Sequence, residues 1–332
     1  RAALSEPCVV DQRVDLEAKL LDCVEELVRG ARNTEVAGED VHRDAVLVTQ
    51  GVGDLFELLL APGDEDQVVF IGCKEMRELG ANVIAYGNHP DGTNINAGCG
   101  SMHPEQMCHW VQEHNADIGI AHDGDADRVL LCDETGTLID GDDIMAIAAL
   151  EMLAEGSLAN NTLVTTVMSN AGLDAAVEAS GGHTVRTPVG DKHVIDAMLQ
   201  YGYNFGGEQS GHLIFGDHAS TGDGLVAALQ ILRIMAAKQQ PLSKLAQCWT
   251  RFPQKLTNLR VTEKKPIEEL EGVPALVDEA ESALQVEGGR VLLRYSGTEP
   301  KIRLLLEGKD AATLDAWSEK IMSAIQAQIG EA

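Results

Sequence analysis

The segment Ala121–Gly136 reads AHDGDADRVLLCDETG and places Asp123, Asp125 and Asp127 at alternate positions, directly before Arg128. Apolar residues come before the three aspartates (118–121) and after Arg128 (129–131), which predicts two buried strands joined by an acidic loop. Alternate residues of an extended loop point the same way, so the three carboxylates can converge. Like charges this close cost free energy unless a cation neutralises them. The segment therefore predicts a metal loop, and Mg²⁺ suits hard carboxylate ligands.

The alternatives are a solvated acidic turn and a calcium-binding loop of the EF-hand type. An EF-hand needs glycine at its sixth position and glutamate at its twelfth. Counting from Asp123, the twelfth residue is Glu134, but the sixth is Arg128 and apolar strand residues lie between them. The spacing therefore argues against an EF-hand.

Outward from this loop, strand-like and helix-like segments alternate along the chain, which predicts an α/β fold. After Phe252-Pro253 the composition shifts to that of a small α+β module. We expect strands at 45–48, 81–86, 116–121, 129–133, 137–140, 162–167, 184–187, 256–261, 290–295 and 302–307, and helices at 16–28, 104–113, 142–154, 171–180, 191–201, 222–237, 267–284 and 312–329.

The composition limits the kinds of molecule that the chain is expected to bind. The 332 residues include 44% hydrophobic residues, enough for more than one domain. With 53 acidic and 25 basic residues the net charge is −28, which disfavours binding to nucleic acids or anionic membranes. No apolar run is long enough for a membrane span, and the first residues show no signal-peptide core. Seven scattered cysteines without a CxxC pair favour reduced thiols and a cytoplasmic protein.

Three further loops carry polar side chains suited to a ligand. Gly206–His212 (GGEQSGH) exposes Glu208 and Ser210 between glycines, which suits sugar hydroxyls but is also common in ordinary polar loops. Arg294–Arg303 (RYSGTEPKIR) offers arginines, hydroxyls and backbone N–H groups for a phosphate, although a surface hairpin would look similar. Gly190–His193 (GDKH) offers a lysine and a histidine for phosphate contact or proton transfer.

Taken in this order, the four loops resemble those of the α-D-phosphohexomutase superfamily over about Met76–Ile329. The segments 90–97 (PDGTNINA), Gly100-Ser101 and 166–170 (TVMSN), with Gln209, are most similar to its branch of bacterial phosphoglucosamine mutases. The resemblance implies repeated mixed α/β domains followed by a small C-terminal α+β domain. It also implies an intramolecular phosphotransferase, an isomerase that interconverts glucosamine 6-phosphate and glucosamine 1-phosphate through a bisphosphate intermediate for cell-wall precursors.

The resemblance also implies a role for each matching residue. Asp123, Asp125 and Asp127 would bind Mg²⁺, and Arg128, Lys192 and His193 would take part in catalysis. Glu208 and Ser210 would bind the sugar hydroxyls, and Arg294, Ser296, Gly297, Thr298 and Arg303 would bind the phosphate that is not transferred.

The same comparison suggests a division of the chain into four parts. Residues 1–70 are unassigned and possibly not native family sequence, and 71–143 resemble part of the second domain with its metal loop. Residues 144–255 resemble the third domain and 256–332 the C-terminal phosphate-binding domain. Because nothing before Ile71 resembles the opening strand of the second domain, we expect an exposed edge in its sheet.

The sequence departs from the family pattern at the phosphoryl donor. The superfamily carries a phosphoserine in a Thr-Ala-Ser-His-Asn-Pro-like loop, and Ser5, Ser101 and Ser169 lie in different settings. We therefore expect this chain by itself to bind without turnover. A phosphomannomutase/phosphoglucomutase and a non-catalytic sugar-phosphate binding protein remain alternatives, and the sequence leaves the oligomeric state open.

The departure leads to a first prediction. Without the serine that carries the phosphoryl group, a mutase loses its nucleophile. The purified 332-residue chain should therefore not interconvert glucosamine 6-phosphate and glucosamine 1-phosphate, even with Mg²⁺ and glucose 1,6-bisphosphate present. A coupled assay for either sugar phosphate measures this, and metal-dependent turnover by the purified chain would contradict it.

Overall fold

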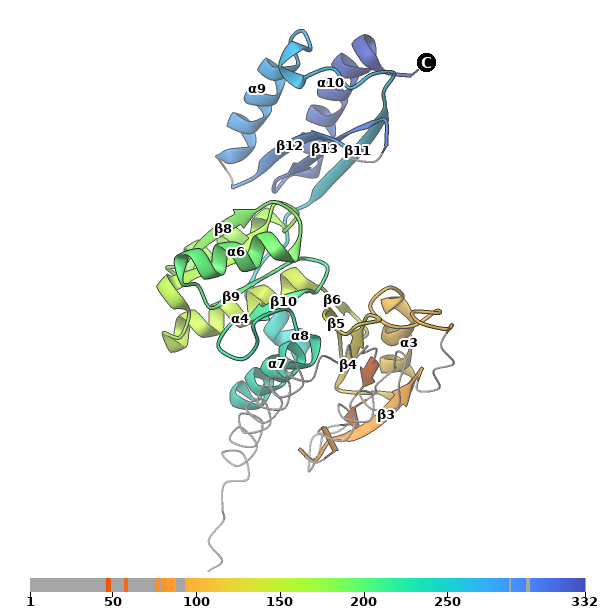
Figure 1. Ribbon diagram of the computed structural model, residues 1–332, viewed down its shortest axis with the longest axis vertical. Coiled ribbons are helices and arrows are strands. Elements are labelled where there is room, and N and C mark those ends of the chain that lie inside the picture. Colours follow the sequence, from red (N-terminus) through yellow and green to blue (C-terminus); the bar gives the residue numbers. More distant parts are fainter. Residues whose placement is uncertain are drawn as a thin grey trace, which may run out of the picture. The chain divides into compact units, whose positions relative to one another are not determined.

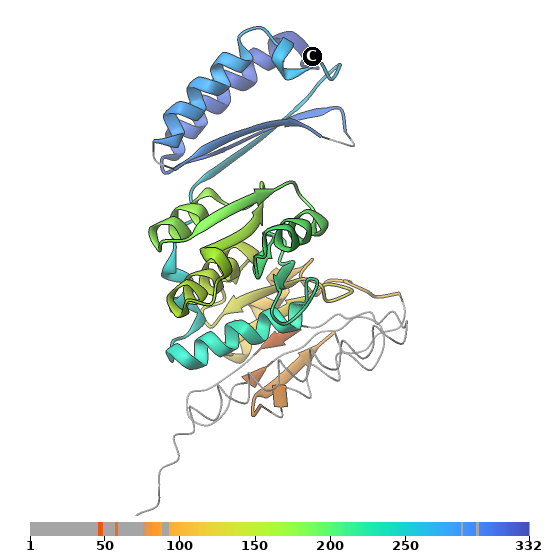
Figure 2. The same ribbon diagram turned by 60° about the vertical axis from the view of Figure 1, so that its left-hand side comes forward.

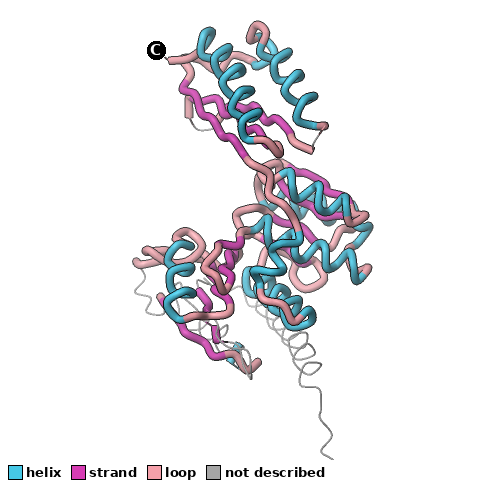
Figure 3. Tube along the Cα trace, turned by 180° about the vertical axis from the view of Figure 1, so that it is seen from behind, coloured by secondary structure: helices cyan, strands magenta, loops and turns pink. Residues whose placement is uncertain are grey.

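The computed structural model describes residues 46–48, 57–58, 76–77, 79–87, 93–286, 288–296 and 299–331. Helices and strands alternate along most of this chain (Figure 3), which confirms the α/β class. The chain divides into two compact units, Arg1–Met168 with Ser180–Cys248, and Ser169–Ala179 with Trp249–Ala332. The predicted helix at 16–28 lies outside the described residues. Within the described ranges, no helix is both long and apolar enough to cross a membrane.

The first unit contains a six-stranded sheet in the order β2-β3-β1-β4-β5-β6 (Figure 1). Helix α3 (Pro104–His114) packs on β4 and β5. Gly119 of β4 permits this close approach, because a Cβ there would lie 2.7 Å from the side chains of Met107 and Val111. The strands are β1 (Val46–Val48), β2 (Glu57–Leu58), β3 (Asn82–Tyr86), β4 (Ile118–His122), β5 (Val129–Asp133) and β6 (Leu138–Ile139).

Strand β1 corrects one expectation from the sequence. It comes from the segment that we left unassigned, and it pairs antiparallel with both β3 and β4. The segment before Ile71 therefore does supply strands to this sheet, and the backbone of β4 is paired on both sides by β1 and β5. The strand predicted at 45–48 is confirmed.

The first unit also contains a four-stranded sheet in the order β10-β9-β7-β8, in which β7 is parallel to β8 and β9. Helix α6 packs on β7, β8 and β9, and α7 packs on β10, on α4 and on β5 of the other sheet. The strands are β7 (Thr162–Thr166), β8 (His183–Thr187), β9 (Phe205–Gly207) and β10 (Leu213–Phe215), and the helices are α4 (Gly141–Glu155), α6 (Asp191–Tyr201), α7 (Gly224–Lys238) and α8 (Leu242–Leu245).

Local sequence fixes where helix α4 begins and ends. The side chain of Asp140 accepts hydrogen bonds from the N–H groups of Asp142 (3.0 Å) and Asp143 (3.2 Å). The Asp143 carboxylate accepts from the N–H of Asp140 (3.1 Å), which completes a capping box. Gly156 ends the helix at φ +71°, a conformation that glycine adopts without a steric penalty. Most of the helix is buried, so its apolar residues are not confined to one face.

The second unit is a three-stranded antiparallel sheet, β11-β13-β12, with α9 and α10 on one face (Figure 2). The helix expected at 267–284 is split, because Gly272 is left-handed (φ +71°) and Pro274 starts a new helix in its first turn. The unit consists of α5 (Ala171–Ala179), β11 (Gln254–Arg260), a 3₁₀ turn (Ile267–Glu269), α9 (Val273–Gln285), β12 (Arg290–Tyr295), β13 (Lys301–Glu307) and α10 (Ala311–Ile329).

Hydrogen bonds explain why residues 169–179 belong to this unit. The Asn170 side chain accepts from the Phe252 N–H (2.9 Å) and donates to the Phe252 carbonyl (2.9 Å). Arg290 donates to the Ser169 carbonyl (2.7 Å) and pairs with Glu307, whose side chain is fully buried. A buried carboxylate requires such a partner, since an unpaired charge in the interior is costly.

Gly211 gives a stability prediction for the first unit. It lies at φ +93°, and a Cβ there would clash with the backbone of Val129. Gly181 is a matched control, because it lies at φ +81° and a Cβ there would meet nothing within 4 Å. Gly181→Ala should cost about 1–2 kcal/mol of unfolding free energy, the penalty of the left-handed conformation alone.

Gly211→Ala should cost more than Gly181→Ala, because the clash adds to the same backbone strain. Urea unfolding of both variants, followed by circular dichroism, measures the difference. Equal losses of stability would mean that the chain relaxes at Gly211 and that the close approach to Val129 is unimportant.

Candidate functional site

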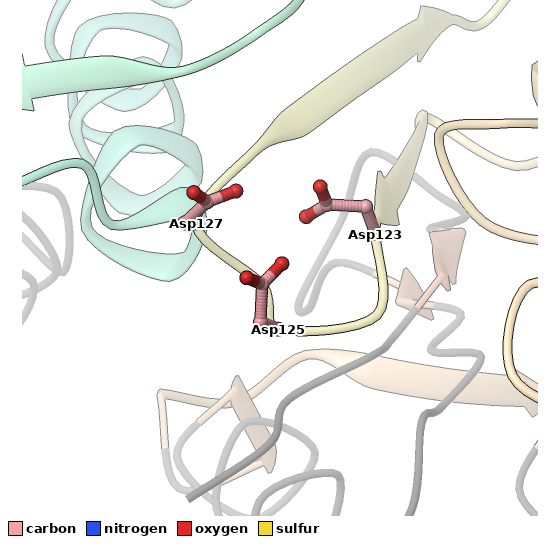
Figure 4. A group of neighbouring side chains, drawn as sticks. All are labelled: Asp123, Asp125 and Asp127. Carbon is pink, nitrogen blue, oxygen red and sulfur yellow. The ribbon is translucent and has the colours of Figure 1, made fainter. Parts of the chain in front are cut away.

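The aspartate loop connects β4 to β5, which are antiparallel neighbours with His122 opposite Val129. The carboxylates of Asp123, Asp125 and Asp127 point toward one another (Figure 4), and one oxygen from each lies within 4.8 Å of the others. Asp123 is buried, Asp127 is half-buried and Asp125 is exposed. The loop closes through hydrogen bonds from Ala126 N–H to the Asp123 carbonyl (3.1 Å) and from Arg128 N–H to the Asp123 carboxylate (3.1 Å).

The pKa values of Asp123 and Asp127 are shifted in opposite directions. Burial, followed by the charge of Asp127, raises the pKa of Asp123 to about 6. The pKa of Asp127 is lowered, mainly by its hydrogen bond with His212. Arg128 offsets part of the negative charge, with its Nε 3.5 Å from an Asp123 oxygen and 3.7 Å from an Asp127 oxygen. The loop therefore holds more negative charge than its arginine neutralises, which is the electrostatic requirement of a cation site.

Backbone contacts join the aspartate loop to the segment Gly206–His212. Arg128 and His212 form an isolated antiparallel bridge, and Val129 N–H donates to the Gly211 carbonyl (3.0 Å). The side chains meet as well, since His212 Nδ1 lies 3.2 Å from Asp127 Oδ2. Burial favours the neutral imidazole, but the hydrogen bond and charge of Asp127 outweigh it and raise the pKa of His212. His212 therefore fixes the position of the Asp127 carboxylate.

The predicted sugar loop also contacts the predicted lysine–histidine loop. Gly190 N–H donates to the Glu208 carboxylate (3.0 Å), so Glu208 lies at the start of α6. Lys192 and His193 are exposed in the first turn of that helix, and Ser210 is exposed in the turn after Glu208. The structure thus brings the aspartate, Glu208 and Gly190 loops together within the first unit, through contacts that the sequence could not specify.

The predicted phosphate loop lies in the second unit, between β12 and β13. Ser296 is buried, and its N–H donates to the Lys301 carbonyl (2.8 Å). Glu299 accepts hydrogen bonds from both Lys301 (2.6 Å) and Arg303 (3.2 Å). Arg294 lies opposite Arg303 in the register of the two strands. Gly297 and Thr298, the remaining predicted members, lie outside the described residues.

The sequence interpretation missed three residues that organise these loops. His212 was part of the glycine-rich loop, and its pairing with Asp127 connects segments that are 85 residues apart. Glu299 was inside the predicted phosphate loop, and the motif did not indicate that its carboxylate accepts hydrogen bonds from two basic side chains. Lys264 donates to the Ser296 carbonyl (2.6 Å) from 32 residues away, and no motif marks it.

Two consecutive parts of the chain match models of one protein family. Residues 140–252 match the family described as "Phosphoglucomutase/phosphomannomutase, alpha/beta/alpha domain III", and residues 256–324 match its "C-terminal domain". The chain belongs to the phosphoglucomutase/phosphomannomutase family of phosphohexomutases.

Among curated proteins, the phosphoglucosamine mutase of Geobacter metallireducens is 54% identical over 255 residues, which are 77% of this chain and 56% of that protein. The phosphoglucosamine mutase of Anaeromyxobacter dehalogenans is 51% identical over 253 residues, 76% of this chain and 55% of that protein. The chain therefore spans about half the length of the curated relatives it matches.

Solved structures show the same fold at low sequence identity. A phosphoglucomutase/phosphomannomutase family protein of Burkholderia thailandensis has a TM-score of 0.62 at 22% identity, covering 79% of this chain and 59% of that protein. The N-acetylphosphoglucosamine mutase of Aspergillus fumigatus, solved with GlcNAc-6P and magnesium, has a TM-score of 0.59 at 20% identity, covering 94% of this chain and 65% of that protein.

The geometry of the aspartate loop leads to a prediction on metal binding. Asp125 is the exposed member of the group, so Asp125→Asn should leave the fold intact while removing one charged ligand. We expect Mg²⁺ affinity to fall about tenfold or more, because losing even an outer-shell partner of a metal typically costs 10–100-fold. Calorimetric titration with Mg²⁺ measures the change.

The control for this variant is Asp196→Asn, which removes one negative charge from an exposed position on α6 outside the aspartate loop. It should leave Mg²⁺ affinity unchanged. Equal affinities of the Asp125→Asn variant and the parent chain would reject the loop as the metal site.

Proposed function

We propose that the chain supplies the metal-, sugar- and phosphate-binding parts of a phosphoglucosamine mutase, which interconverts glucosamine 6-phosphate and glucosamine 1-phosphate. One observation carries the proposal. Asp127, one of the three converging carboxylates, is hydrogen-bonded to His212, whose loop also carries Glu208. The chain is 54% identical to a phosphoglucosamine mutase over 255 residues. Transfer of a phosphoryl group on a sugar requires carboxylates that bind a cation and polar side chains that bind the sugar hydroxyls, placed on adjoining loops.

The residues of the aspartate loop fit Mg²⁺. Among the described residues, the buried Oδ1 atom of Asp127 has no hydrogen-bond partner, and its nearest cation is Arg128 Nε at 3.7 Å. The pKa of Asp123 is raised to about 6, so both carboxylates gain from a nearby cation. Oxygen ligands of this type suit Mg²⁺, and the related Aspergillus fumigatus enzyme was solved with magnesium. When bound, Mg²⁺ would be held by Asp123, Asp125 and Asp127 and would neutralise charge on a phosphoryl group.

Other side chains of this chain would contact the sugar and the phosphate. We assign Glu208 and Ser210 to the sugar hydroxyls, because both lie on the short turn that His212 fixes against the aspartate loop. Arg128, half-exposed beside Asp123 and Asp127, would hold a phosphoryl oxygen. Lys192 and His193, in the first turn of α6, would contact phosphate or move a proton at a sugar oxygen.

The second unit would hold the phosphate that is not transferred. In this proposal Arg294 and Arg303 donate charged hydrogen bonds to that phosphate, and Ser296, Gly297 and Thr298 add hydroxyl and backbone N–H donors. Glu299 pairs with Arg303 and Lys301, which orders the arginine before a ligand arrives. The ligands would be a hexosamine phosphate and its bisphosphate.

The proposed division of the chain follows from these assignments. Residues 71–143 would carry the metal loop, 144–255 the sugar loop and 256–332 the phosphate loop, with 1–70 unassigned. The superfamily's serine loop would complete the site.

A chimaera tests the proposal. Residues 76–332 are fused behind an N-terminal segment of a phosphoglucosamine mutase that carries the superfamily's serine loop. With Mg²⁺ we expect interconversion of the glucosamine phosphates that is faster than that of the mannose or glucose phosphates. Arg294→Ala in this chimaera should lower kcat/KM by roughly tenfold to over a hundredfold, because a lost charged hydrogen bond costs about 1.5–3 kcal/mol.

Lys301→Ala is the matched control, because Lys301 already pairs with Glu299 and its loss should have a smaller effect. Faster turnover of mannose or glucose phosphates would favour a phosphomannomutase/phosphoglucomutase instead. A folded chimaera that binds sugar phosphate and never turns it over would favour a non-catalytic sugar-phosphate binding protein.

A further inference from the structure

A pair of cysteines lies away from the aspartate loop, where α3 packs on the six-stranded sheet. Cys132 of β5 is completely buried, and Cys108 of α3 is half-buried against the same apolar cluster, which also contains Met107, Val111 and Ala121. Cys108 packs against the cluster that contains Cys132, and each thiol influences the pKa of the other. Both are free thiols.

The packing of α3 on the sheet explains why the two cysteines lie in one cluster. Gly119 lies directly opposite Cys132 in the β4–β5 register. Because Gly119 has no side chain, Met107 and Val111 press close to the sheet at this level, and a Cβ there would lie 2.7 Å from each of them. Cys108 follows Met107 in the helix and packs against the cluster that contains Cys132.

The two thiols differ in their access to small molecules. Cys108 lines a surface hollow of about 500 Å³, together with Glu105, His109 and Leu138. Cys132 has 0% of its surface exposed and belongs to the cluster against which Cys108 packs. One sulfur can thus meet a small reagent from solvent, while the other can be reached from Cys108.

We propose that Cys108 and Cys132 form a redox-modification site that reacts with peroxides and closes a disulfide between α3 and β5. The Cys108 thiolate attacks one oxygen of hydrogen peroxide, the O–O bond breaks, and Cys108 becomes a sulfenic acid while hydroxide leaves. The Cys132 sulfur then attacks the Cys108 sulfur, the S–O bond breaks, and water leaves. In total, two thiols and one peroxide give one disulfide and two waters, and a thiol reductant reverses the change.

The difference in access assigns these roles, and the directions of the two pKa shifts agree with it. The interaction with Cys132 is the largest influence on Cys108 and lowers the pKa of its thiol, which favours the reactive thiolate. The same interaction, followed by burial, raises the pKa of Cys132. The proton of Cys132 also has a second acceptor, because its sulfur lies 3.4 Å from the Asp133 carbonyl oxygen. Cys108 is therefore the attacking thiol and Cys132 the resolving thiol.

Peptide mapping of the full chain tests the proposal. The reduced protein receives a brief pulse of hydrogen peroxide, is alkylated with N-ethylmaleimide, and is digested with trypsin and a glutamyl endopeptidase. Cleavage after Glu105 separates Cys108 from Cys99. We expect a cross-linked pair of the peptides that contain Cys108 and Cys132, lighter than the two reduced peptides by two hydrogen masses, and its loss on treatment with dithiothreitol.

Single serine variants separate the two roles. In Cys132→Ser the sulfenic acid at Cys108 should persist and be labelled by dimedone, whereas in Cys108→Ser the buried Cys132 should stay reduced. Cys99→Ser and Cys248→Ser are controls that remove a neighbouring and an exposed thiol, and the cross-link should form in both as in the parent chain.

Three results would overturn the proposal. They are complete alkylation of Cys108 in the protein after the peroxide pulse, a cross-link from Cys108 to a cysteine other than Cys132, and a dimedone adduct at Cys108 in the parent chain as abundant as in Cys132→Ser. Circular dichroism of each variant before the pulse confirms that the compared proteins are folded.

Discussion

The mutual repulsion of three carboxylates is the constraint around which the first unit is organised. Asp123, Asp125 and Asp127 converge on one point, and burial of Asp123 makes the repulsion stronger than it would be in water. Backbone N–H donation from Arg128, the Arg128 guanidinium and the imidazole of His212 each reduce it. The loop keeps its shape because these donors come from elements that are themselves fixed by sheet pairing.

The same donors connect the loop to the rest of the unit. His212 reaches Asp127 because the backbone of Gly211 and His212 pairs with Arg128 and Val129. The turn that carries His212 also carries Glu208, whose carboxylate accepts from Gly190 at the start of α6. A chain of hydrogen bonds therefore runs from the acidic loop to α6.

The second unit contains a buried charge of its own. Glu307 is fully buried at the end of β13, where an unpaired carboxylate would be costly. Arg290 at the start of β12 pairs with it and also donates to the carbonyl of Ser169, while Asn170 holds both backbone groups of Phe252. These contacts make residues 169–179 part of the second unit, although they follow β7 of the first unit in the chain.

The sequence by itself determined most of the helices and strands, and the identity of the acidic loop. Alternating apolar residues and turn residues encode local structure, so β4, β5 and α6 lie within a few residues of their predicted bounds. The spacing of Asp123, Asp125 and Asp127 sufficed to predict that their carboxylates converge, because alternation in an extended chain is a local property. The split of the helix at 267–284 was missed, since the left-handed Gly272 is a single-residue feature inside an apolar pattern.

The tertiary structure alone decided which distant groups meet. The His212–Asp127 pair, the Lys264 contact to Ser296 and the placement of β1 between β3 and β4 all join residues that are far apart in the chain. The same is true of Cys108 and Cys132, which pack in one apolar cluster where Gly119 lets α3 approach the sheet. Pairings of this kind depend on how elements stack, and the stacking is set by the sum of many weak contacts that no local pattern encodes.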